Sequence, residues 1–98
     1  MELQEAFDKI TVKLKAASGR GVAPSIRVSG DEWVCTIDER KKKSVFIAKK
    51  GELVLVDMES NKNEPEIHRI AVPESDQPQI IDRIKEAVTE AYGTLPVS

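Results

Sequence analysis

The stretch that decides the fold runs from residue 32 to residue 58 and reads EWVCTIDERKKKSVFIAKKGELVLVDM. It contains three runs rich in β-branched, aromatic and aliphatic residues, and polar tips separate these runs at Arg40-Lys41 and at Lys50-Gly51. Apolar runs of this length with turn residues between them predict consecutive β-strands that are joined as hairpins. We therefore expect antiparallel strands over residues 32–38, 43–49 and 52–58.

The two turns also predict the register of the strands. A two-residue turn at Lys50-Gly51 sets Phe46 opposite Leu55, and a turn centred on Arg40-Lys41 sets Cys35 opposite Phe46. Successive side chains point to opposite faces of a sheet, so this pairing divides the apolar residues into two sets. The set with the larger residues should form the core, and it comprises Trp33, Cys35, Ile37, Phe46, Ala48, Leu53 and Leu55. The opposite set comprises Val34, Val45, Ile47, Val54 and Val56, with Thr36 at its margin and Glu32, Asp38, Lys43, Lys49 and Glu52 as a charged rim.

The flanking segments complete an α+β fold. Apolar residues recur at helical spacing from Glu2 to Ala17, with Gly19 as the expected stop, and again after Asp76-Gln77-Pro78, with Gly93 as the second stop. Short strands are expected over 25–28 and 66–72. The order predicts a two-layer sandwich of helix, antiparallel meander of four or five strands, and helix, with both helices on one face. We expect one domain over residues 1–98, with a loosely ordered tail at 94–98.

An uncovered apolar face is a consequence of this architecture. Each helix has a single apolar stripe, whereas the sheet is apolar on both sides. We expect the valine-rich set to bind another protein or a second copy of this chain, as an adaptor, chaperone, inhibitor or regulator would. Two alternatives stay open: the tail Leu95-Pro96-Val97 or one helix covers the face, or a register slip of one residue exchanges the two faces.

A cluster of cations at the first turn gives an alternative function. Arg40, Lys41, Lys42 and Lys43 are consecutive, and the segment from Arg40 to Lys50 contains six basic residues and no acidic one. Such a segment can bind nucleic acid through its phosphates. The tips lie at opposite ends of one strand, however, and no aromatic residue lies within them to stack on a base.

The totals exclude several classes of protein. The 98 residues have a net charge of −2, whereas general nucleic-acid binders usually have a basic surplus. A single cysteine cannot form an internal disulfide and fits a cytoplasmic protein. We expect neither a leader peptide nor contact with a membrane, because no apolar run approaches the roughly 20 residues that a membrane-spanning helix needs.

Catalytic and metal sites have little support in the sequence. The chain contains one cysteine and one histidine, Cys35 and His68, and structural zinc usually takes four such ligands. In a meander these two residues lie three strands apart, at roughly 14 Å, so they cannot form a nucleophile–base pair. We expect no catalytic residues, no metal and no cofactor, and we keep a small enzyme without a known motif as a second alternative.

The order of elements resembles that of two known groups, the frataxins and some bacterial secretion chaperones. Frataxins have an acidic ridge along the first helix and the first strand. Here Glu2, Glu5 and Asp8 are followed by Lys9, Lys13 and Lys15, and the first strand contains Arg27. This resemblance is therefore confined to the expected fold, and it does not imply an iron-handling role.

Overall fold

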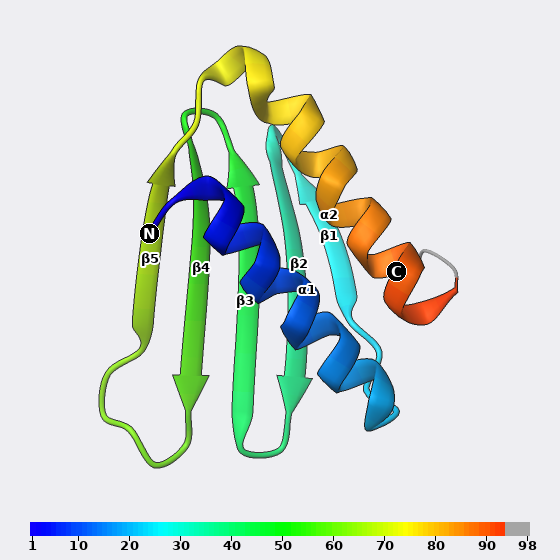
Figure 1. The fold of residues 1–98 in the computed structure, drawn as a ribbon. Coiled ribbons are helices and arrows are strands. Elements are labelled where there is room, and N and C mark those ends of the chain that lie inside the picture. The colour runs from blue at the N-terminus through cyan, green and yellow to red at the C-terminus, as the bar shows by residue number, and fades with distance from the viewer. Residues whose placement is uncertain (94–98) are drawn as a thin grey trace.

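The structure, a computed structural model, describes residues 1–93. Its elements are α1 (Leu3–Gly19), β1 (Ser25–Ser29), β2 (Glu32–Glu39), β3 (Lys42–Lys49), β4 (Glu52–Glu59), β5 (Glu66–Ala71), the 3₁₀ turn η1 (Glu74–Asp76) and α2 (Gln77–Tyr92). The five strands form one antiparallel sheet in the order β1-β2-β3-β4-β5, and both helices lie on the same face of it (Figure 1). The predicted α+β fold is confirmed. The expectations for the tail 94–98, and for Leu95-Pro96-Val97 as a cover of the sheet, lie outside the described residues.

The register of the two central hairpins agrees with the sequence-based prediction. Cys35 lies opposite Phe46, and Phe46 lies opposite Leu55. The turn at Lys50-Gly51 is tight because Gly51 adopts a φ of 88°, which residues with a Cβ atom rarely do. The alternative with a slip of one residue is therefore wrong.

The core lies between the sheet and the two helices. The apolar stripe of α1 buries Phe7, Ile10 and Leu14, and that of α2 buries Ile80, Ile84 and Val88. On the sheet, the residues with the larger side chains face the helices as predicted; the buried ones are Trp33, Cys35, Ile37, Phe46, Ala48, Leu53 and Leu55. Each large aliphatic side chain that is fully buried stabilises the fold by about 1.5–3 kcal/mol relative to exposure.

The end of α1 differs in one detail from the prediction. The helix continues through Gly19 and ends because Gly21, at a φ of 75°, turns the chain into the left-handed region. The N–H of Gly21 donates to the carbonyl of Ser18 at 3.0 Å, and the N–H of Val22 donates to that of Ala17 at 2.9 Å. This pair of bonds is a Schellman motif, which needs the left-handed residue two positions later than we expected.

Side-chain hydrogen bonds fix the helices in place. The Tyr92 hydroxyl donates to the Val22 carbonyl at 2.6 Å, and the Ser18 hydroxyl donates to the Ala91 carbonyl at 2.7 Å. At the other end of α2 the buried Gln77 amide donates to the Asp31 carbonyl at 2.6 Å. Both ends of α2 are therefore tied to the side of the sheet that α1 occupies. Within residues 1–93, neither helix has the combination of length and hydrophobicity that a bilayer crossing demands.

Candidate functional site

The face of the sheet opposite the helices, here called the open face, carries the valine-rich set. Val34, Ile47 and Val54 lie side by side in one row across β2, β3 and β4. Val45 and Val56 lie in the next row. No helix or strand within residues 1–93 covers this face (Figure 1), so the alternative in which a helix covers it is wrong.

Exposure is uneven within this set. Val34, Val45, Ile47 and Val56 are half-buried, because neighbouring strands shield the side chains at the middle of the sheet. Val54 is only 4% exposed, although no helix lies over it. Its contribution to a contact would therefore be smaller than that of its neighbours.

The structure adds residues from the outer strands to the open face. Ile67 of β5 lies opposite Val56 and is 47% exposed. The row of Val34 ends in an arginine at each edge of the sheet, Arg27 on β1 and Arg69 on β5. Sequence reasoning missed Ile67 and Arg69 because the connection before β5, residues 60–65, is too long for its length alone to set the register.

Charged residues surround the open face as predicted, and several of them are paired. Glu52 accepts a hydrogen bond from Arg69 at 3.0 Å and forms an ion pair with Lys49 at 3.1 Å. Asp38 and Glu32 share this face and have no ion pair within residues 1–93. The rim thus contains both signs of charge, which suits contact with another mixed surface.

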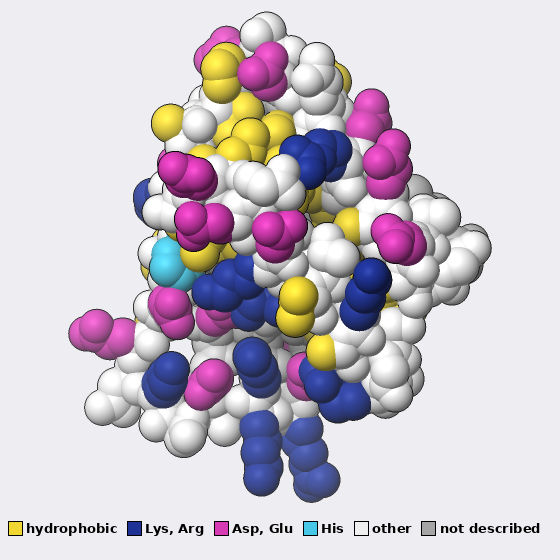
Figure 2. Space-filling model, in the orientation of Figure 1, with side chains coloured by type: hydrophobic (Ala, Val, Ile, Leu, Met, Phe, Trp, Pro, Cys, Tyr) yellow, Lys and Arg dark blue, Asp and Glu magenta, His cyan; other side chains and the backbone are white. Residues whose placement is uncertain are grey.

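The basic turn between β2 and β3 is the largest group of unpaired cations in the described part of the chain. Among these residues, Arg40, Lys41, Lys42 and Lys43 form no ion pair. Figure 2 shows basic side chains gathered at the end of the molecule where this turn lies. Lys50, at the opposite end of β3, pairs instead with Asp31 at 3.4 Å, so the two basic tips are separate, as expected.

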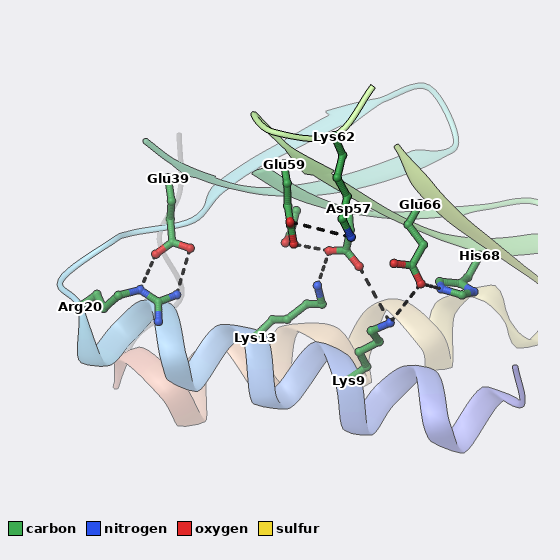
Figure 3. A network of polar contacts seen from close by, with 10 residues as sticks. Lys9, Lys13, Arg20, Glu39, Asp57, Glu59, Lys62, Glu66 and His68 are labelled. Carbon is green, nitrogen blue, oxygen red and sulfur yellow. Dashed lines mark hydrogen bonds and ion pairs between the residues drawn. The ribbon is translucent and has the colours of Figure 1, made fainter. Parts of the chain in front are cut away.

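A network of ion pairs fastens α1 to the sheet, and the sequence did not reveal it (Figure 3). Lys13 donates to Asp57, which also accepts a hydrogen bond from the buried Ser44 hydroxyl at 3.0 Å. Lys9 lies 4.0 Å from the carboxylates of both Asp57 and Glu66. The side chains of Lys13 and Asp57 are only 14% and 11% exposed, so these charges stabilise one another away from bulk water.

The surroundings of the two carboxylates lower their pKa values. Burial of Asp57 favours the protonated form, but the hydrogen bonds from Lys13 and Ser44 and the charges of Lys13 and Lys9 outweigh it, so the pKa of Asp57 is lowered. The pKa of Glu66 is lowered by its hydrogen bond with His68, whose Nε2 lies 2.7 Å away, and by the charge of Lys9. Both groups therefore act as anions that hold the helix.

Cys35 and His68 do not form a site together. They lie on β2 and β5, with β3 and β4 between them. Cys35 is fully buried, and burial raises the pKa of its thiol to about 12, so the thiol stays protonated at neutral pH. His68 interacts with Glu66 at the edge of the covered face.

Neither the arrangement of possible metal ligands nor comparison with known proteins points to a function. Within residues 1–93, no three His, Cys, Asp or Glu side chains gather closely enough to hold a metal ion. The chain matched no model of a known protein family, no curated protein and no solved structure. Function is therefore inferred from the geometry of the open face and of the basic turn.

Proposed function

We propose that this protein is a non-enzymatic interaction module that associates through the open face. The single observation that supports the proposal is a row of aliphatic side chains on a sheet face that no element of residues 1–93 covers. A soluble protein rarely leaves a contiguous aliphatic surface of this kind in water without a partner. An adaptor, chaperone, inhibitor or regulator would use such a face.

The size of the face suits a protein contact. Five strands about 4.8 Å apart, with central strands of eight residues at about 3.3 Å each, span roughly 600 Å². A standard interface buries about 800 Å² on each partner. Specific interfaces bury about 600–1,000 Å² on each partner, so a contact that covers the whole sheet reaches the lower end of that range.

A second copy of the chain is the partner that this face fits most simply. Two identical sheets can pack face to face across a two-fold axis, with their aliphatic rows interdigitated. The rim supports this arrangement because, within residues 1–93, it offers unpaired acids, Glu32 and Asp38, as well as the unpaired Lys43. The proposed dimer therefore needs no cofactor and no second kind of subunit.

Light scattering after size exclusion tests the proposal, at protein concentrations up to about 100 µM. We expect the wild type to show twice the chain mass of 10.9 kDa at the upper concentrations. Ile47→Lys should be monomeric, because a charge buried in an apolar contact is costly. Val12→Lys is the matched control: Val12 lies on α1, on the other side of the molecule, and is 66% exposed.

Two outcomes would contradict self-association through the open face. One is a wild type that stays monomeric over the whole concentration range. The other is a dimer that Ile47→Lys and Val12→Lys weaken equally, which would place the contact elsewhere. Circular dichroism of both variants verifies that each substitution leaves the fold intact.

We propose electrostatic binding of nucleic acid through Arg40, Lys41, Lys42 and Lys43 as the second candidate function. The observation that favours it is the absence of any ion pair to these four side chains within residues 1–93. Four neutralised phosphates would give a salt slope of about −3.6 for a random duplex. A salt titration that detects no binding at about 50 mM salt would rule this function out.

A further inference from the structure

A cavity of about 150 Å³ lies between α1 and the ends of strands β2 and β3 that meet at the basic turn. Its apolar wall consists of Val12 and Ala16 from the helix and Ile37 from the sheet. The volume equals that of about five water molecules, which is enough for a phosphate group and the first atoms attached to it.

Three cations line this cavity from two elements. Lys13 and Arg20 come from α1 and its C-terminal end, and Lys42 comes from β3. Among the described residues, Glu39 is the one carboxylate in the lining, and Asp57 lies next to it in contact with Lys13 and Ser44, so three cations face two carboxylates. The site is open to solvent, because Val12 is 66% exposed and the Arg20 side chain is 55% exposed, so an anion there would be held by direct hydrogen bonds to the cations.

Two of these cations are held in position and still have hydrogen bonds to donate. Arg20 donates through Nε and Nη2 to Glu39 at 2.6 and 2.9 Å, as Figure 3 shows, and its remaining N–H groups are unused in residues 1–93. Lys13 donates to Asp57 and keeps further N–H groups, because an ammonium has more than one. Glu39 and Asp57 thus orient Arg20 and Lys13 and leave each of these cations with N–H groups that can bind a ligand.

Lys42 completes the lining as a cation that has no ion pair within residues 1–93. Its charge reaches the cavity, since it contributes to the lowered pKa of Glu39, after the larger effect of the Arg20 hydrogen bond. Lys41, the preceding residue in the turn, does not line this cavity. The two neighbouring lysines therefore differ in position while they share charge and exposure.

We propose that this cavity binds a phosphate group, with Lys13, Arg20 and Lys42 as the donors. A tetrahedral phosphate presents oxygens in several directions, which suits three donors that come from two elements. The site is on the helix side of the sheet and does not depend on association through the open face. The phosphate group can belong to a small phosphate compound or to a nucleic acid.

The test is a titration with inorganic phosphate in a buffer of low ionic strength, in which the amide chemical shifts of the protein are measured at each phosphate concentration. Sodium chloride at matched ionic strength serves as the control for general screening. We expect saturable shifts around residues 13, 16, 20, 42 and 44 with phosphate and none of this pattern with chloride. Shifts that chloride reproduces would overturn the proposal.

Two charge variants separate a site from general attraction to the turn. Lys42→Ala and Lys41→Ala each remove one positive charge from adjacent positions. We expect Lys42→Ala to weaken phosphate binding about tenfold and Lys41→Ala less than about twofold, because only the first removes a donor from the cavity. Equal weakening by both variants would overturn the proposal in favour of diffuse attraction.

A third variant tests the cavity without any change of charge. Ala16→Leu adds a larger side chain to the lining of the cavity and keeps all three cations. We expect it to abolish phosphate binding with an unchanged circular dichroism spectrum, and unchanged binding would overturn the proposal. Duplex DNA is added as a competitor to identify the source of the phosphate. If DNA displaces inorganic phosphate, and Lys42→Ala weakens this displacement more than Lys41→Ala does, the ligand is a nucleic acid. If DNA does not displace inorganic phosphate, the ligand is a small phosphate compound.

Discussion

The two faces of the sheet carry aliphatic side chains in similar number, yet only one of them is closed. On the covered face Ile37 is 2% exposed beneath the helices, whereas on the open face Ile47 is half-buried by its neighbours in the sheet alone. The number of aliphatic residues therefore does not distinguish the two faces, whereas the larger side chains of the covered face do. What decides burial is the number of layers, because two helices tied together on one side cannot cover the other.

The largest expected effect compares these two isoleucines. Ile37→Ala should lower the free energy of unfolding by about 2–5 kcal/mol, since it leaves a cavity beneath the helices. Ile47→Ala should cost less than about 1.5 kcal/mol in the monomer, because the space that it leaves is open to solvent. Urea denaturation at low protein concentration measures both. Equal losses would mean that the open face is already closed within one chain.

A second comparison uses an aspartate from each face. Asp57→Asn on the covered face should lower the free energy of unfolding by about 2 kcal/mol, because it leaves the 14%-exposed Lys13 without its partner. Asp38→Asn on the open face should change it by less than about 0.5 kcal/mol, as is usual for an exposed position. Thermal and urea unfolding of the two variants measure both changes. A larger loss at Asp38 would show that the network in Figure 3 does not hold α1.

The pH dependence of stability should follow the same carboxylate. The pKa of Asp57 in the folded protein is lowered below the unfolded value of about 3.9, so its contribution is complete above that value and is lost as the pH falls through the folded pKa. The stability difference between wild type and Asp57→Asn should therefore shrink on acidification below about pH 4. Urea titrations at neutral and acidic pH measure it. A difference that grows in acid would have the wrong sign.

The smallest effects are expected from carboxylates at the surface. Glu39→Gln loses the bidentate pair with the half-exposed Arg20 side chain, and Glu52→Gln loses the pairs with Lys49 and Arg69. Each loss should lower the free energy of unfolding by less than about 1 kcal/mol. Only Glu52 lies beside the open face, so only Glu52→Gln should alter the salt dependence of association. Light scattering at low and high salt compares the two. The same change in both variants would argue against the open face as the contact.

Much of the fold could be predicted because the signals are local. The short turns at Arg40-Lys41 and Lys50-Gly51 set the register of three strands, and the alternation within each strand then assigned Phe46 to one face and Val45 to the other. The position of Ile67 escaped prediction, since residues 60–65 form a longer connection whose length does not set the register. The end of α1 was placed too early because two glycines, Gly19 and Gly21, satisfy the same rule.

The candidate sites could be predicted only in part. The residues of the open face and the basic turn can be predicted from the sequence pattern, but the ion pairs between distant charged residues cannot. Lys13 and Asp57 are 44 positions apart, and no sequence rule links them. The same holds for the cavity, because its proposed donors come from α1, from the end of that helix and from β3. Contacts between segments distant in the chain depend on how layers pack.

The amino-acid sequence by itself determined the strands, their register and the division of apolar residues into two faces, because side-chain alternation and turn geometry act over a few residues. Only the tertiary structure decided which of the fifteen basic residues find a carboxylate and which stay unpaired within residues 1–93. These outcomes depend on where α1 and α2 pack on the sheet. Their positions are fixed by apolar packing and by hydrogen bonds between distant segments of the chain, such as the one from Tyr92 to Val22.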